Sequence, residues 1–352
     1  MKYFLGKLIE TRKGDQPMIH LKTRFVFSAP LAVALFLSAG FLAVAPAAHG
    51  QSPSQSTFSS ADDALQALVA AAKAKDRDAF AKLFGSDFDQ LLSGDDVEDA
   101  KERDEFAVAV GESAQLQKID DSKYTVTVGN DNWPTPIPLV QNHGKWFFDT
   151  KAGLDEVFNR RVGDNELSAI ATCRAYAVAQ WEYFTEGDWD HDGVAEYAQN
   201  LISTPGAHDG LYWETLEDDT PSPLGKLIAA AQAEGYGPRA SKTGAAGKER
   251  PDKEAPQIDH APYHGYYFKV LTRQGPHAPG GKYSYIINGN MIAGYAFVAY
   301  PDKWGSSGVM TFIINQQGRV YEKNLGPNSA KLASTMTEYD PDPTWKLVEA
   351  QP

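Results

Sequence analysis

Apolar positions recur with a helical period in the first third of the chain. Ser60 can cap a helix, because two aspartates follow it and apolar residues then return every three or four positions. A second apolar stripe spans 78–92 and is ended by Gly94, and the next segment, 95–110, is charged until its last turn. We therefore predict three helices between residues 59 and 110.

The period changes to two after these helices. Side chains alternate over 124–128, a proline-spaced apolar run covers 137–140, and the phrase GKWFFD closes the set at 144–149. The segment 142–144 suits a tight hairpin turn, so we predict an antiparallel meander that curls over the helices. This order of elements resembles the cone-shaped domains of the nuclear-transport-factor-2-like superfamily. That resemblance implies either a small-molecule site or a scaffold, and the fold alone favours the scaffold.

A long helix is expected over 164–184. Asp164 can cap it, Glu166 lies in its first turn, and its apolar face is rich in small residues that permit close packing. Segment 234–262 instead combines glycine, proline and charged residues with almost no apolar side chains. That composition predicts a mobile insertion.

Strand patterns dominate the remainder of the chain. Residues 265–271, 292–300 and 308–315 are rich in aromatic and β-branched side chains. We predict that the long helix packs on an antiparallel sheet built from these strands. The expected fold class is α+β throughout, with an N-terminal module over 51–160 and a C-terminal module over 161–352.

The first 50 residues follow the order of a secretory signal. Residues 25–44 carry no charge, two basic residues lie just before them, and small residues follow. A signal peptidase needs small side chains at the first and third positions before the cut, which 48–50 provides and 45–47 offers as a second option. A start at Met18 would give the signal a head of ordinary length. We expect cleavage and a periplasmic or secreted product; the alternative is a retained membrane anchor, since about 20 apolar residues span a bilayer.

Charge and cysteine content narrow the classes of function. Removing the six basic and two acidic residues of the signal from the 33 and 46 of the whole chain leaves a net charge of −17. An acidic protein repels phosphate backbones, so nucleic acid is not an expected partner. Cys173 is the single cysteine, which excludes an intramolecular disulfide. It lies in an apolar helical pattern, so we interpret it as a buried structural thiol rather than a nucleophile.

The best-defined local motif is the acidic loop at 188–196. Oxygen ligands at alternate positions of a tight loop can converge on a hard cation, and Gly193 permits the sharp turn behind them. The calcium loop of helix-loop-helix proteins places a bidentate glutamate where this chain has Gln199. We predict a structural calcium site, the alternative being a solvated acidic turn; its candidate ligands are Asp188, Asp190, Asp192 and Glu196.

Other residue patterns give weaker indications of chemistry. His260 and His264 have the spacing of two metal ligands on a helix, but Pro262 between them excludes that helix. His208 and Asp209 could form an acid–base pair, although a satisfied loop histidine is the simpler interpretation. The sequence contains no G-x-S-x-G, phosphate-binding glycine loop or H-E-x-x-H. We expect core packing for seven aromatic residues and loop roles for three aspartates: Trp213, Tyr266, Tyr267, Tyr295, Trp304, Tyr339 and Trp345, and Asp149, Asp340 and Asp342.

Four phrases together resemble a known family. They are NELSAIATCRAYAVAQWEYF, STPGAHDGLYW, GYAFVAYPDKWGSSGVMTFIINQQGRVYEKNLG and YDPDPTW. They are similar to the bacterial exported-protein family catalogued as domain of unknown function 2950, which implies an exported protein and brings no catalytic residues. The helix and the acidic loop also look distantly similar to the globular part of pseudopilins. This chain lacks the pilin order of a cleavage signal joined directly to a long apolar helix.

We therefore expect a periplasmic or envelope-associated protein with a non-catalytic binding, structural or assembly role. Its expected partners are envelope proteins or glycans, and it would contact the membrane only through an uncleaved N-terminal segment. One alternative is a hydrolase of envelope polymers that uses carboxylates in an aromatic groove. Another is a small-ligand carrier that uses the N-terminal module.

Overall fold

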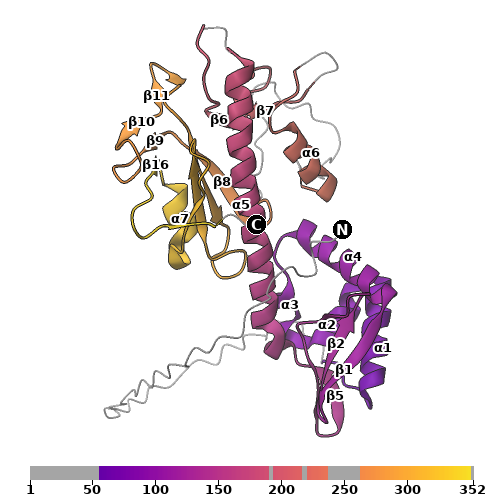
Figure 1. Cartoon of the computed structure of the whole chain (residues 1–352). Coiled ribbons are helices and arrows are strands. Elements are labelled where there is room, and N and C mark those ends of the chain that lie inside the picture. Colours follow the sequence, from indigo (N-terminus) through magenta and orange to yellow (C-terminus); the bar gives the residue numbers. More distant parts are fainter. Residues whose placement is uncertain (1–54, 190–192, 216–219, 237–261, 350–352) are drawn as a thin grey trace, which may run out of the picture. The chain divides into compact units, whose positions relative to one another are not determined.

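The computed structural model describes residues 55–189, 193–215, 220–236 and 262–349 (Figure 1). The signal predicted over 1–50, its cleavage positions and most of the insertion predicted over 234–262 lie outside these residues. Helices and antiparallel sheets are both present, so the α+β class is confirmed. None of the helices in the described ranges is long and apolar enough to cross a membrane.

Helices fill the first part of the chain, as the periodicity predicts. The Ser60 hydroxyl accepts a hydrogen bond of 3.0 Å from the Asp63 amide and so caps the first of them. The predicted helix over 78–92 is divided, because Gly85 adopts φ +71 and interrupts it. The elements are α1 (Ala61–Ala74), α2 (Arg77–Phe84), η1 (Gly85–Asp87), α3 (Phe88–Leu91) and α4 (Asp96–Glu112).

An antiparallel sheet follows in the order β1-β2-β4-β5, with β3 paired to β2. The hairpin turn predicted at 142–144 is present, with positive φ at His143 and Gly144. Phe148 from β5 packs edge-on against Phe84 from α2, with ring centroids 5.6 Å apart. The strands are β1 (Ala114–Asp120), β2 (Lys123–Val128), β3 (Trp133–Pro134), β4 (Leu139–Asn142) and β5 (Lys145–Phe148).

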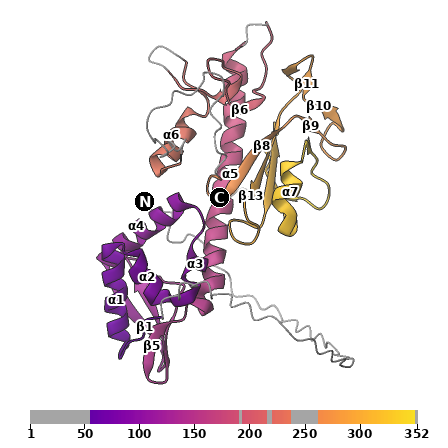
Figure 2. The ribbon, with the colours of Figure 1, turned by 180° about the vertical axis from the view of Figure 1, so that it is seen from behind.

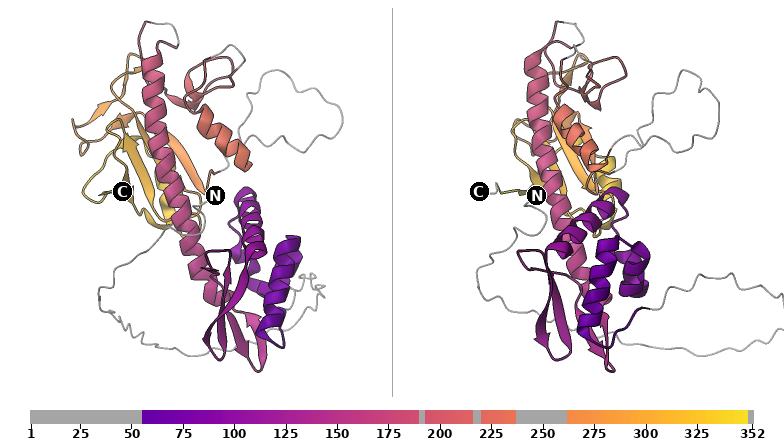
Figure 3. Two further views of the ribbon diagram at one scale, coloured as in Figure 1. Left: turned by 45° about the vertical axis from the view of Figure 1, so that its right-hand side comes forward. Right: turned by 90° about the vertical axis from the view of Figure 1, so that its right-hand side faces the viewer.

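The long helix α5 (Thr150–Glu186) is an unbroken helix of 37 residues (Figure 3). Its cap is Asp149, which accepts a hydrogen bond of 3.1 Å from the Ala152 amide. The start predicted at Asp164 is therefore wrong, and Asp164 lies inside the helix. Because α5 passes through the boundary predicted between residues 160 and 161, one rigid element belongs to both proposed modules, within the compact unit Pro53–Pro352.

A second antiparallel sheet, in the order β17-β15-β14-β13-β8, packs against α5. The ring of Phe297 stacks on Tyr176 of α5 at 4.0 Å. Lys269 lies on the other face and donates to the Ser334 carbonyl in α7. The two helices therefore cover opposite faces of the sheet, as Figure 2 also shows. These elements are β8 (Tyr266–Leu271), β13 (Ala296–Pro301), β14 (Thr311–Asn315), β15 (Tyr321–Lys323), β17 (Lys346–Leu347) and α7 (Ser329–Ser334).

Shorter elements surround this sheet. A parallel pair of strands and one helix lie between α5 and β8 in the chain, and three small pairings lie between β8 and the C-terminus. They are β6 (Asn200–Ile202), β7 (Gly210–Tyr212), α6 (Gly225–Glu234), β9 (Arg273–Gln274), β10 (Tyr283–Ser284), β11 (Ile286–Ile287), β12 (Asn290–Met291), η2 (Gly326–Asn328) and β16 (Glu338–Tyr339).

Candidate functional site at the α4–α5 junction

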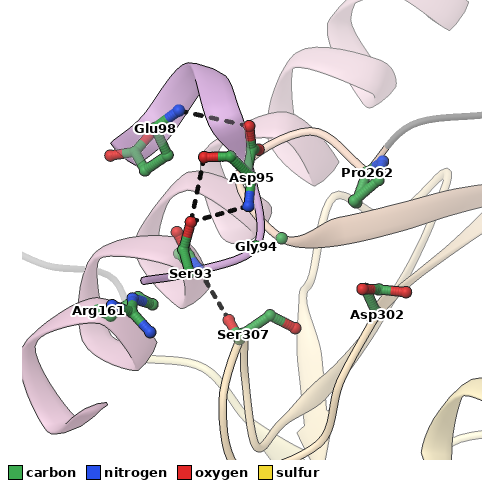
Figure 4. Close-up of a pocket in the computed structure, with 10 residues that line it drawn as sticks. Ser93, Gly94, Asp95, Glu98, Arg161, Pro262, Asp302 and Ser307 are labelled. Atoms are coloured by element: carbon green, nitrogen blue, oxygen red, sulfur yellow. Dashed lines mark hydrogen bonds between the residues drawn. The ribbon is translucent and has the colours of Figure 1, made fainter. Parts of the chain in front are cut away.

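A small polar cavity lies where the start of α4 meets the middle of α5 and the loops beside β8 and β13 (Figure 4). Its volume is about 20 Å³, which is room for roughly one water molecule. A cavity of this size does not admit an organic substrate. The lining residues are Ser93, Gly94, Asp95, Glu98, Arg161, Asn165, Pro262, Gly265, Asp302 and Ser307.

Asp95 connects two elements at the edge of this cavity. Its Oδ1 caps α4, accepting hydrogen bonds of 3.0 and 3.3 Å from the Val97 and Glu98 amides. Its Oδ2 accepts a bond of 2.9 Å from the hydroxyl of Tyr236, which follows α6. The cap therefore also attaches the end of α6 to the start of α4.

His264 makes a second connection between the same elements. Its Nδ1 lies 3.1 Å from Oε2 of Glu98 in α4, and its Nε2 lies 3.0 Å from Oε2 of Glu234 at the end of α6. The Tyr236 hydroxyl lies 3.3 Å from the same Glu98 oxygen. An imidazole that faces carboxylate oxygens with both nitrogens donates from both only when it is protonated. We call this arrangement the clamp, because one imidazole faces a carboxylate from each of the two helices.

Buried carboxylates crowd the junction. Burial raises the pKa of Glu102 to about 7, helped by the charges of Glu98, Asp99 and Asp164 and opposed by Arg161. Burial likewise raises the pKa of Asp164 to about 6. Burial alone would also raise the pKa of Glu98. The hydrogen bond and charge of His264, together with Lys101 and Tyr236, outweigh burial, and the pKa of Glu98 is lowered.

Arg161 is the buried cation of this group, with only 4 % of its surface exposed. Its guanidinium donates to the carbonyls of Leu91 and Leu92 at the end of α3, where the partial negative charge of a helix terminus favours a cation. Its Nε makes no hydrogen bond to any of the residues that the structure describes. Arg161 therefore ties α3 to α5 and partly offsets the surrounding carboxylates.

Comparisons with known proteins identify the family. A model of the family described as a protein of unknown function (DUF2950) matches residues 55–348. The chain belongs to this family. Neither the comparison with curated proteins nor the comparison with solved structures found a match. The DUF2950 description names no activity, so the site has to be interpreted from its geometry.

Two of the four predicted calcium ligands of this DUF2950 chain lie in the described residues. Asp188 Oδ2 accepts a hydrogen bond of 2.7 Å from the Gly193 amide, which closes the acidic loop. Glu196 Oε2 accepts one of 2.8 Å from the Met291 amide in β12. Asp190 and Asp192 lie outside the described residues, and the described part holds no cluster of three metal-ligating side chains. The calcium site stays a prediction.

The histidines serve local structure. The ring of His208 stacks on Trp213 at 4.3 Å, while Asp209 accepts hydrogen bonds from the amide and hydroxyl of Thr204. This geometry supports a satisfied loop histidine. Sequence analysis missed a pair formed by His277 and Asp340, 2.9 Å apart, because 63 positions separate them. His260 lies outside the described residues.

The aromatic residues and loop aspartates have mainly structural roles. Five of the seven aromatic side chains are buried, which confirms core packing for them: Trp213, Tyr266, Tyr295, Tyr339 and Trp345. Asp149, Asp340 and Asp342 each accept a backbone hydrogen bond, as loop carboxylates do. Cys173 is fully buried, and burial raises the pKa of its thiol to about 12. The interpretation as a buried thiol is confirmed.

Apolar side chains follow the exposed face of α5. Val178 and Trp181 expose 58 % and 60 % of their surfaces, and Leu167 and Ala171 are also exposed. This face lies opposite the residues of α5 that pack on the sheet, such as Tyr176 and Ala179. We call it the outer line of α5; it comprises Leu167, Ala171, Arg174, Val178, Trp181 and Thr185.

Proposed function

We propose that this protein is exported to the periplasm or envelope and has a non-catalytic binding, structural or assembly role. In this proposal the outer line of α5 is the binding surface. The single observation that supports it is the exposure of Val178 and Trp181. Both lie on a solvent-facing side of α5, where a helix normally carries polar residues.

The chemistry of the outer line supports binding. Burying an aliphatic or aromatic side chain is worth about 1.5–3 kcal/mol, and contiguous exposed apolar surface marks interaction sites. Tryptophan and arginine are the side chains that most often dominate protein interfaces, and Trp181 and Arg174 both lie on this line. Envelope proteins are therefore better candidate partners than glycans for this face.

The junction supports a structural role for the ionizable groups. Glu98, His264 and Tyr236 hold α4 to the end of α6, and the cavity beside them has room for little more than water. A hydrolase of envelope polymers would need two carboxyls across an open aromatic cleft. The carboxylates of Asp149, Asp340 and Asp342 each accept a hydrogen bond from a backbone amide, which favours a structural role for them.

The alternative of a small-ligand carrier requires an apolar cavity in the N-terminal module. There, aromatic rings and aliphatic side chains pack against one another between the helices and the sheet; they include Phe80, Leu83, Phe84, Leu139 and Phe148. This packing favours a scaffold. The distant likeness of the C-terminal part to pseudopilins remains part of the proposal, and the packing of a long helix on an antiparallel sheet supports it.

The proposal is tested by photo-crosslinking in intact cells of a diderm bacterium. A photoreactive amino acid at position 178 should give a defined crosslinked product in the periplasmic or envelope fraction. The same amino acid at position 151 is the control, because Lys151 is exposed on the first turn of the same helix and lies off the outer line. Identical patterns from the two positions, or no product from position 178, would contradict a binding role for this face.

A further inference from the structure

Resting on the proposed binding role of α5, we propose that the occupant of the outer line is a second copy of this chain. The two α5 helices pair antiparallel about a two-fold axis at Val178. The exposed line, its charges and its pattern of large and small side chains together favour this partner over an unrelated helix.

The outer line has the spacing of a helix-pairing seam. Its six residues are separated by four, three, four, three and four positions, the a/d spacing by which two helices pack along their length. The seam spans 18 residue steps, roughly 27 Å of helix. All six residues are exposed, so no part of the described chain covers this seam.

Charge decides the direction of the pairing. In a parallel pair, whose two-fold axis runs along the helices, Arg174 would face Arg174 of the second copy. In an antiparallel pair about Val178, position i lies at the level of position 356 − i, so Arg174 lies at the level of Glu182 of the second copy. The antiparallel pair therefore brings opposite charges together, whereas the parallel pair brings two arginines together, and this difference favours the antiparallel pair.

Side-chain size agrees with the antiparallel arrangement. Trp181 lies at the level of Ala175 of the second copy, so the largest side chain of the seam meets a small residue that borders it. Arg174 of the second copy lies within one residue of that level and can stack on the indole face. Val178 meets Val178 at the axis. A two-fold interface uses one patch on both copies, and this patch complements itself.

The interface is small, so the dimer should be weak. One helix face of this length buries less than the roughly 1,200–2,000 Å² of stable interfaces. Each mature chain also carries a net charge of −17, which opposes association. We expect a dissociation constant on the order of tens of micromolar. Monomers at low concentration are consistent with this expectation.

Cysteine crosslinking of the purified mature chain tests the geometry. Because Val178 lies on the axis, Val178→Cys should form a disulfide-linked dimer under mild oxidation. Ala171→Cys alone should not, because position 171 lies at the level of position 185; an equimolar mixture of Ala171→Cys and Thr185→Cys should form the mixed dimer. The native Cys173 is buried and serves as the unreactive background. Self-crosslinking of Ala171→Cys would overturn the antiparallel arrangement.

Sedimentation equilibrium from 5 to 500 µM tests the occupant. The wild type should approach dimer mass at the upper end, and Trp181→Glu should weaken association at least tenfold. Leu332 in α7 is half exposed and lies off the seam, so Leu332→Glu should leave association unchanged. Far-ultraviolet circular dichroism checks that both variants fold. A wild type that stays monomeric at 500 µM overturns the dimer. If the wild type stays monomeric but the position-178 crosslink in cells contains a different protein, the dimer is wrong and the proposed binding role of this face still holds.

Discussion

Nδ1 of His264 lies 3.1 Å from Oε2 of Glu98, and this contact joins residues 166 positions apart in the chain. Glu98 is 5 % exposed, so its carboxylate is nearly removed from water and depends on its partners. The pair attaches the segment before β8 to the first turn of α4.

Loss of the imidazole should destabilise the junction. His264 adopts φ +46, a conformation that asparagine tolerates, so His264→Asn changes the side chain without straining the backbone. We expect a loss of about 1–3 kcal/mol in the free energy of unfolding, measured by urea denaturation at pH 7, because Glu98 keeps its charge and loses a donor. His277→Asn, at a half-exposed pair, is the control and should cost clearly less than His264→Asn, because solvent screens an exposed pair. Equal losses in the two variants would contradict the clamp.

Glu102 should make stability fall as pH rises. Its pKa is about 7 in the folded chain against an ordinary value of 4.5, so the unfolded chain loses its proton first as the pH increases. The free energy of unfolding should therefore fall between pH 4.5 and 7 and level off above. Asp164, with a pKa of about 6, contributes in the same direction at lower pH.

Glu102→Gln removes this titration. We expect the variant to be about 1–2 kcal/mol more stable than the wild type at pH 8, with the difference shrinking below pH 5. Thermal or urea denaturation across this pH range measures it. Asp104→Asn is the matched control on the same helix, since Asp104 is exposed and paired with Lys75. A pH profile that Glu102→Gln leaves unchanged would refute the assignment.

Calcium should stabilise the acidic loop. We expect added Ca²⁺ to raise the melting temperature and Asp190→Ala to abolish the rise. Asp89→Ala, which removes an exposed carboxylate from α3, should leave the rise intact. A melting curve that neither calcium nor chelator moves would exclude the metal at Asp188, Asp190, Asp192 and Glu196.

Cys173 should be inert in the folded chain. Burial raises the pKa of its thiol to about 12, so almost no thiolate forms at neutral pH. Iodoacetamide should label the protein only in denaturant, as measured by mass spectrometry. Rapid labelling of the native protein at pH 8 would show that the thiol reaches solvent.

The positions of helices could be predicted where buried apolar residues recur every three or four positions along the chain. The start of α5 could not be predicted, because its first turns bury Thr150, Gly153 and Arg161, which form no apolar stripe. The apolar pattern begins only near Leu167, so Asp164 resembled a cap. Strand β1 was missed for a related reason: as an edge strand it is largely exposed and carries polar residues.

The junction could not be predicted from local patterns. Glu98 lies in a charged helix and His264 beside a proline-rich segment, and neither position has a motif around it. Only the fold brings them together. Pro262 excluded a helical metal pair of His260 and His264, but nothing in the sequence indicated that two carboxylates from distant elements engage His264. The outer line of α5 was not predicted either, because the sequence does not tell that Val178 and Trp181 lie on an exposed face.

Export is the claim on which the envelope role depends, and fractionation with N-terminal sequencing of the mature protein tests it most directly. The account predicts a periplasmic or secreted protein that begins at Gln51, or at Ala48 if the second option is cut. A cytoplasmic protein that keeps Met1 or Met18 at its N-terminus would contradict the account.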